Sequence, residues 1–465
     1  WILARTLEEL EFVHKWLPED GTSHESPTYM IFGLAHLTLA MQSADRCLGT
    51  EFTQDAFFEN VGSFLIQTLT PGLEQRFTYG DGGTGVGQLG YDAVLYHTAS
   101  IFRQGSVQSA LDRRVETEGL EWGWMGLVWF DPTVKTTPVA DLAKRRHFDD
   151  IGLVILRDSW DAAGSAAMFK CGPMGGVALN RYRNANKMVY VNVAHDDPDA
   201  NSFTIFANGE FVAETDRYSR HKQSANHNTI LVNGIGQLAK GRQEGGVWSQ
   251  PGGNMLEMGR LTAYQEAGGI VVAEGEAAGS YIAVENKRPA LERFRRTFVW
   301  VEGKYILVLD DIRAPKQVKI EWLVQSGEIA RDAETTGRYI LKKGTAQCPV
   351  MIQSSLPVES SIVDSPADHR GKPLGWRQLR LTAAADAIRF VSLSFPWGGD
   401  GKLGTVDWQA DTAVFEVRSG GTSEAWEWTM ASDGEASSKL RGLRDGNVFF
   451  QMDVSNGRPL PLRNE

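Results

Sequence analysis

The sequence contains few cysteines, no long apolar run and fewer basic than acidic residues. Its three cysteines, Cys47, Cys171 and Cys348, are odd in number and widely spaced, which excludes a disulfide framework and a cysteine-based zinc site. We expect buried free thiols. No apolar stretch approaches the roughly 20 residues that a membrane-spanning helix needs, so no membrane is expected as a partner. The net charge of −11 argues against nucleic acid.

Repeats and nucleotide-binding motifs are also missing. The chain shows neither a repeat of about 20–50 residues nor a Walker or dinucleotide fingerprint. It begins at Trp1 with no signal peptide before it, which predicts a mature or truncated product. Such a start is compatible with a periplasmic or a cytoplasmic location, and the sequence leaves the oligomeric state open.

Two halves of the chain have different hydrophobic periods. Residues 1–135 place apolar side chains at the three-to-four residue spacing of helices, and residues 28–45 are apolar nearly all round, which predicts a helix buried between others. Residues 145–465 read as many short strands separated by turns. We predict an α+β multidomain protein, with an α-helical portion followed by a large antiparallel β-sandwich.

One hairpin of the second half follows a dense acidic stretch. TIFANGEFVAE alternates apolar and polar residues around Asn208 and Gly209, a strong hairpin signal. The segment before it, HDDPDAN, carries His195, Asp197 and two further aspartates. This segment is either a solvated turn or a site that faces a ligand.

Residues able to bind a metal gather in and after this stretch, on segments that neighbour one another in the predicted sheet. They are His195, Asp196, Asp197, Asp199, Asp216, His221 and His227. Basic residues flank the acidic stretch on both sides and indicate either an anionic ligand or ordinary solvated strand faces. They are Arg181, Arg183, Lys187, Arg217, Arg220 and Lys222.

Two loops of the helical half carry further unusual residues. In DGTSHESP, a helix N-terminus explains Ser26, Pro27 and Glu25, but it does not explain His24. In TYGDGG, Tyr79 lies in a glycine-rich loop with no core pattern around it. Glycine lets such a loop approach a ligand closely.

Together these motifs resemble the heparinase II/III-type polysaccharide lyases. The specific block runs from HDDPDANSF through NGEF to HNTILVNGIGQ, and DGTSHES and YGD resemble loops of the helical half. Among these lyases the chain is most similar to the exotype oligo-alginate lyases. The resemblance implies a partial (α/α) toroid that lacks its N-terminal helices. It also implies β-elimination on an anionic, uronate-containing polysaccharide or oligosaccharide, alginate first, which gives a 4,5-unsaturated uronate.

The resemblance also implies roles for individual residues. His24 would lie beside the uronate carboxylate, Tyr79 would transfer a proton, and His195 would be the second catalytic histidine. A tyrosine with a pKa near 10 suits the acid that protonates the leaving oxygen, which leaves His195 as the base. Glu25 and the basic residues would bind substrate.

The resemblance further implies one structural divalent ion held by Asp197, Asp216 and His227. Many relatives have a histidine where this chain has Asp197. Aspartate ligates zinc, the first expectation, and equally suits calcium or manganese.

Three alternatives remain open at this point. A heparin-type glycosaminoglycan lyase would need more cations for sulfate groups. A toroid glycoside hydrolase would use a carboxylate pair such as Glu25 and Asp81. A non-catalytic sugar-binding protein would use some of the 14 tryptophans as platforms.

Overall fold

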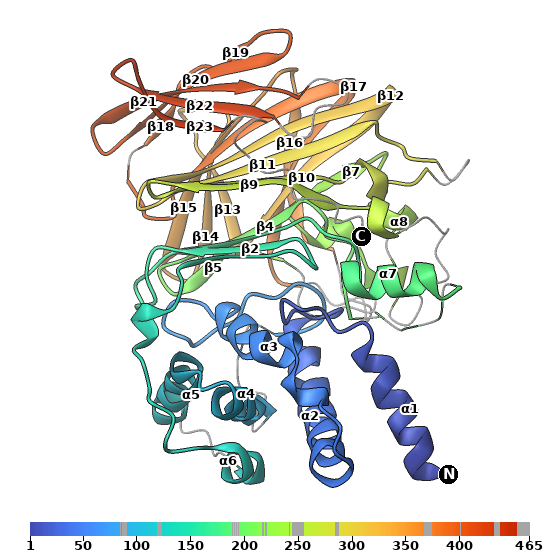
Figure 1. Cartoon of the computed structure of the whole chain (residues 1–465). Coiled ribbons are helices and arrows are strands. Elements are labelled where there is room, and N and C mark those ends of the chain that lie inside the picture. The colour runs from blue at the N-terminus through green and yellow to red at the C-terminus, as the bar shows by residue number, and fades with distance from the viewer. Residues whose placement is uncertain are drawn as a thin grey trace.

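The computed structural model consists of a helical layer and stacked antiparallel sheets. It describes residues 1–83, 85, 91–118, 123–187, 189, 191, 193, 195–215, 218, 221–240, 242–243, 255–283, 288–366, 374–399, 401–431 and 438–452. The helices lie below the first sheet in Figure 1, and the C-terminal strands lie at the top. The predicted fold class, helices followed by a large antiparallel β-structure, is confirmed.

The helical layer is built from the segments whose apolar spacing predicts helices. Its elements are α1 (Ile2–His14), α2 (Pro27–Leu48), α3 (Ala56–Gln67), η2 (Tyr91–Val94), α4 (Leu95–Ile101), α5 (Gly105–Glu118) and α6 (Gly123–Trp129). The Ser26 side chain caps α2 by accepting from the Tyr29 N–H, and Gly49 ends it in the left-handed conformation.

The expectation that α2 is buried all round is wrong. Its buried residues include Met30, Leu34 and Met41, which lie on one side of the helix. Phe32 and Leu39, on another side, are 47% and 41% exposed. Described helices therefore cover α2 on one side only, and a partly aromatic face stays open.

The first sheet separates the helices from the rest of the β-structure. Its order is β1 (Arg145–Phe148), β2 (Leu153–Arg157), β3 (Ala166–Lys170), β4 (Ser202–Ala207) and β5 (Glu210–Ala213). In β2, Leu153 and Ile155 belong to the helical core, whereas Val154 and Leu156 belong to the core shared with the next sheet. Because alternate residues enter different cores, both faces of this sheet are buried. The segment that carries His195 leads directly into β4 and so enters between the helical core and the core shared with the next sheet.

The second and third sheets complete the stack. Among the described residues the second has the order β13 (Glu328–Arg331), β14 (Arg338–Lys343), β15 (Ala346–Ser354), β17 (Arg377–Ser394), β12 (Tyr305–Ser326), β11 (Arg293–Val301), β10 (Ile270–Glu276) and β9 (Arg260–Ala267), with β16 (Glu359–Asp364) and β7 (Ile230–Val232) off this path. The third contains β18 (Lys402–Leu403), β19 (Asp407–Trp408), β20 (Thr412–Ser419), β21 (Thr422–Thr429), β22 (Lys439–Arg444) and β23 (Asn447–Met452). Within the described residues the predicted sandwich thus consists of three stacked sheets, and β6 (His221–Lys222) pairs with β8 (Arg242–Gln243) in a separate two-stranded sheet.

The predicted hairpin around Asn208 and Gly209 is present, and a second hairpin joins β11 to β12. Asn208 and Gly209, with φ of 52° and 81°, connect β4 to β5 in the conformation that Asn-Gly favours. The strands β11 and β12 form the second hairpin, with Val301 opposite Tyr305.

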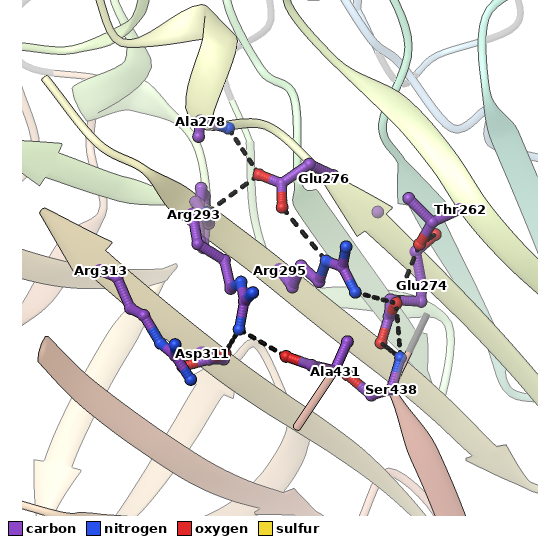
Figure 2. Close-up of polar contacts among 12 residues, drawn as sticks. Thr262, Glu274, Glu276, Ala278, Arg293, Arg295, Asp311, Arg313, Ala431 and Ser438 are labelled. Atoms are coloured by element: carbon purple, nitrogen blue, oxygen red, sulfur yellow. Dashed lines mark hydrogen bonds and ion pairs between the residues drawn. The ribbon is translucent and has the colours of Figure 1, made fainter. Parts of the chain in front are cut away.

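A buried polar network attaches the C-terminal segment to the second sheet (Figure 2). The Arg293 guanidinium donates to Asp311 at 3.0 Å and to the Ala431 carbonyl at 2.7 Å. The Glu274 carboxylate accepts from the Thr262 hydroxyl at 2.9 Å and from the Ser438 N–H at 3.1 Å. Every one of these contacts lies within the protein, so we assign the network a structural role.

Two expectations about the whole chain can be compared with the described residues. Cys171 and Cys348 are buried free thiols as predicted, whereas Cys47 is exposed. No described helix combines the length and the apolar character that crossing a membrane requires.

Candidate active site

His195 is held in place by the glycine-rich loop of the helical half. Its Nδ1 lies 2.9 Å from Asp81 Oδ2, and its carbonyl accepts from the Asp81 N–H at 2.9 Å. Gly80 has φ of +85°, and a Cβ there would lie 2.0 Å from the His195 carbonyl oxygen. Only glycine permits this approach. In a neutral imidazole this carboxylate places the proton on Nδ1, so the lone pair lies on Nε2.

The aromatic ring of Tyr29 covers the ring of His195. Tyr29, in the first turn of α2, stacks on it with ring centroids 3.4 Å apart and an interplanar angle of 8°. The Tyr29 hydroxyl lies 3.0 Å from that of Tyr218, which is 42% exposed. The structure therefore brings one imidazole and two phenols from distant segments to one place.

The loop before α2 supplies the two predicted residues His24 and Glu25. The Glu25 carboxylate accepts from the His195 N–H at 3.4 Å, and the His24 ring packs edge-on against Trp16 at 4.9 Å. Burial lowers the pKa of His24 to about 4, and His195 acts in the same direction, so His24 is neutral at pH 7. Burial raises the pKa of Glu25 to about 7, against the opposing effect of His195.

A buried chain of charges lies behind His195. The Lys222 ammonium donates to Asp81 and lies 3.2 Å from Asp197 Oδ1. Burial acts to lower the pKa of Lys222, but Asp197 and Asp81 raise it above its ordinary value, so the ammonium stays charged. Burial acts to raise the pKa of Asp197, but Lys222 and His227 hold it below its ordinary value. This ion-pair chain connects Lys222 and the acidic segment to the loop that orients His195.

Two of the three predicted metal ligands lie together. His227 Nε2 is 3.5 Å from Asp197 Oδ2, and His227 Nδ1 is 2.6 Å from the Thr215 hydroxyl. A metal-binding histidine usually has its other ring nitrogen hydrogen-bonded, and in His227 the Thr215 hydroxyl lies at that nitrogen. Asp216, the third predicted ligand, lies outside the described residues. Within the described part of the chain, no group of three or more potential ligands is assembled.

The acidic stretch is not a solvated turn. Asp196, Asp197 and Asp199 are each at most 3% exposed. Asp196 accepts from the Gly175 N–H at 2.8 Å, and Asp199 accepts from the Lys170 ammonium. These aspartates are therefore internal partners that shape the segment carrying His195.

Tyr79 occupies a different place from the one expected. Only 1% of it is exposed, and the Lys170 ammonium lies 5.3 Å from the centre of its ring. Burial, and then Asp196, raise the pKa of Tyr79 well above its ordinary value. The expectation that Tyr79 lies outside the core is wrong: Tyr79 belongs to the core of the helical half and directly precedes Gly80, which packs against His195.

The structure also corrects the predicted basic clusters. Arg183 is buried and donates to Asn180 at 3.0 Å and to the Val189 carbonyl at 3.2 Å. Lys222 is buried in the ion-pair chain described above. Arg181 lies on α7 (Val177–Ala185) and Lys187 lies just after it, and both side chains are exposed. They therefore belong to a helix and its end, and not to the solvated strand faces that were the alternative to an anionic ligand. Arg217 and Arg220 lie outside the described residues.

Sequence reasoning offers Tyr29 and Tyr218 only as the next candidates for the acid after Tyr79, and it gives Asp81 no part in the lyase site. Tyr29 lies three residues after the helix cap Ser26 and so points back over the loop that carries His24. Asp81 belongs to the same YGD motif as Tyr79, two positions further on. In both cases the sequence predicts a role for a residue nearby in the chain, His24 for Tyr29 and Tyr79 for Asp81.

Comparison with known proteins agrees with this architecture. Residues 140–374, just over half of the chain, match the family described as heparinase II/III-like, C-terminal. A solved heparinase III, the BT4657 gene product, is similar at a TM-score of 0.62 and 13% identity, over 92% of this chain and 61% of that one. A mutant heparan sulfate lyase HepC from Pedobacter heparinus is similar at a TM-score of 0.59 and 14% identity, over 90% of this chain and 60% of that one.

These structural likenesses concern the fold alone, because the identities are low. The chain spans about three fifths of the length of each of these two solved proteins.

Proposed function

This chain belongs to the heparinase II/III-like family, and we propose that it is a polysaccharide lyase acting on a uronate-containing chain by β-elimination. One observation carries the proposal. A histidine whose Nδ1 is fixed by Asp81 lies against Tyr29 and next to Glu25, a carboxyl group with a raised pKa. Elimination needs a base, an acid and a group that neutralises the uronate carboxylate, and these three are present.

The proposed base is His195. Its Nε2 takes the proton from C5 of the uronate, and the electron pair left on C5 forms the C4–C5 double bond as the C4–O4 bond breaks. Asp81, in contact with Nδ1, stabilises the imidazolium that results.

The proposed acid is the Tyr29 hydroxyl, which replaces the buried Tyr79 in this role. Phenols suit this step because a pKa near 10 keeps them protonated at neutral pH, while they remain stronger acids than the alcohol formed at O4. Tyr29 gives its proton to O4, and the exposed Tyr218 hydroxyl, 3.0 Å away, returns a proton from solvent.

Glu25 and His24 act on the uronate carboxylate. While that carboxylate is fully charged, the C5 proton is barely acidic. A protonated Glu25 donates a hydrogen bond to it and favours the enolate-like intermediate, as a neutral acid in an apolar site can. Neutral His24 supports the same carboxylate.

We expect the titration of Glu25 to produce a descending limb in the pH–rate profile of kcat/KM. With a pKa of about 7, Glu25 loses its proton as the pH rises through neutrality, so kcat/KM should fall above that value. Glu25→Gln keeps a hydrogen-bond donor that does not titrate, and this limb should disappear from its pH–rate profile. His24→Gln is the control and should retain the limb, because the His24 pKa of about 4 lies far below the window. An unchanged limb in Glu25→Gln would contradict the assignment.

Two substrate classes have specific support. The motifs resemble those of oligo-alginate lyases, and two of the basic side chains predicted to bind substrate are engaged inside the protein, which favours an unsulfated polymer such as alginate. Likeness to solved proteins named heparinase III and heparan sulfate lyase favours a heparan-type glycosaminoglycan. A panel of alginate, other polyuronates, heparin and heparan sulfate, followed by the ultraviolet absorbance of the conjugated unsaturated uronate, tests the proposal. No absorbance gain on any uronate polymer would refute it.

A structural divalent ion remains part of the proposal, with Asp197 and His227 as ligands and Asp216 as the third. The short distance between His227 Nε2 and Asp197 Oδ2, 3.5 Å, supports a metal site at this place. Zinc suits this set of ligands. We place the ion in a structural role, where it links segments of the β-structure.

Elemental analysis should find about one zinc per chain, and chelation or Asp216→Ala should lower the melting temperature. Glu427→Gln, which removes an exposed pair with Arg441, is the control and should change neither quantity. A well-folded protein without any bound ion would contradict this part of the proposal.

A further inference from the structure

One exposed face of α2 carries a cluster of aromatic rings. Phe32 lies 5.2 Å from Tyr91 and 4.9 Å from His36 between ring centroids, and His36 lies 5.8 Å from Tyr91. Phe32 is 47% exposed, His36 is exposed and Tyr91 is half-buried. The His36 Nδ1 is 2.9 Å from the Phe32 carbonyl, which turns Nε2 away from the backbone.

Gly33 opens a space in the middle of this face. It lies inside α2, it is exposed, and its φ is not positive, so its backbone conformation does not require glycine. A Cβ built at Gly33 meets no described atom within 4 Å. Glycine in a helix interior costs about 1 kcal/mol relative to alanine. The described packing does not explain this cost, whereas a ligand that approaches the helix backbone would.

The cluster continues directly from the candidate active site. Tyr29, Phe32, Gly33 and His36 are spaced by three, four and seven residues and therefore share one face of the helix. Tyr29 stacks on His195, and His36 lies about 10 Å further along the axis. That distance is longer than one sugar ring.

We propose that Phe32, Gly33, His36 and Tyr91 form a distal subsite that binds a pyranose ring of the uronate chain, beyond the sugars at the cleaved bond. Phe32 presents a ring on which the apolar side of a sugar can stack. Gly33 gives that sugar room against the helix, and His36 Nε2 is placed to bond a uronate carboxylate or hydroxyl. The inference rests on the proposed function, because it takes its ligand class from it.

Substrates of different length test the subsite. In the full chain, Phe32→Ala should raise KM about tenfold for a long uronate oligosaccharide and leave kcat unchanged, because uniform binding is lost. The shortest oligosaccharide that is cleaved should show no change. Leu48→Ala is the matched control: Leu48 is 46% exposed on the same helix, about 24 Å from Phe32, and its loss should not affect KM.

Gly33 offers a test in which stability and binding change in opposite directions. Gly33→Ala and Gly33→Glu should both raise the melting temperature, because both residues favour helix. Gly33→Glu should also raise KM tenfold or more for long substrates, since it fills the space and repels uronate. Equal effects on short and long substrates, or a fall in melting temperature for Phe32→Ala with no change in KM, would overturn the subsite.

Calorimetry with an uncleaved oligosaccharide separates the two proposals. The protein could bind the oligosaccharide through Phe32 and still yield no unsaturated product. That result would refute the lyase proposal and support the subsite. Turnover with a KM that is indifferent to Phe32 and Gly33 would refute the subsite alone.

Discussion

Replacing His195 with glutamine is expected to lower kcat by about 10²–10⁴-fold, the contribution typical of a general base. Glutamine keeps a polar side chain of similar length, but it cannot take the C5 proton. KM should change much less, because the lost interaction belongs to the transition state. Initial rates of unsaturated-uronate formation at saturating substrate measure the effect.

His147 provides the matched control for this variant. It also pairs with a carboxylate, Asp149 at 3.2 Å, and it also stacks on a tyrosine, Tyr264 at 5.0 Å. It lies on β1, outside the cluster around His195. His147→Gln should retain nearly full kcat, and an equal loss in both variants would point to damaged folding instead of a missing base.

Replacing Tyr29 with phenylalanine should lower kcat by at least about 10²-fold, whereas Tyr79→Phe should keep most of the activity. Both changes delete one hydroxyl and keep the ring. Tyr29 stands against His195 with its hydroxyl next to that of Tyr218, but Tyr79 is buried and its hydroxyl has no hydrogen-bond partner among the described residues. Single-turnover rates at saturating oligosaccharide compare the two variants directly.

Tyr218→Phe should give an intermediate loss, because Tyr29 would then regain its proton more slowly. The reverse order, with Tyr79→Phe inactive and Tyr29→Phe active, would return the acid role to Tyr79.

Local signals in the sequence were sufficient for the broad architecture. The change of hydrophobic period separates the helices from the sheets, because helices and strands bury side chains at different spacing. The β4–β5 hairpin follows from Asn208 and Gly209, whose preference for positive φ is intrinsic. His24 and His195 stand out in the sequence because a helix N-terminus or an ordinary turn does not explain them, whereas Glu25 enters only through the family resemblance.

Long-range contacts explain what sequence reasoning missed. Lys222 lies in a basic stretch that reads as a solvated surface, but it reaches Asp81, which is 141 positions away. Tyr79 reads as a loop residue until Gly80 meets the His195 carbonyl, a contact over more than a hundred residues. Tyr29 occupies a helix position that reads as apolar packing. Periodicity does not report such pairings, since it describes neighbours along the chain.

The most direct test of the central claim is mass spectrometry of the products formed from a defined uronate oligosaccharide in water enriched in heavy oxygen. Elimination breaks the C4–O4 bond without adding water, so the account predicts that the product masses, read before the new reducing end exchanges its anomeric oxygen, sum to the substrate mass. It also predicts that His195→Gln forms almost no product. Products that carry one added water labelled with heavy oxygen would show a glycoside hydrolase and contradict the account.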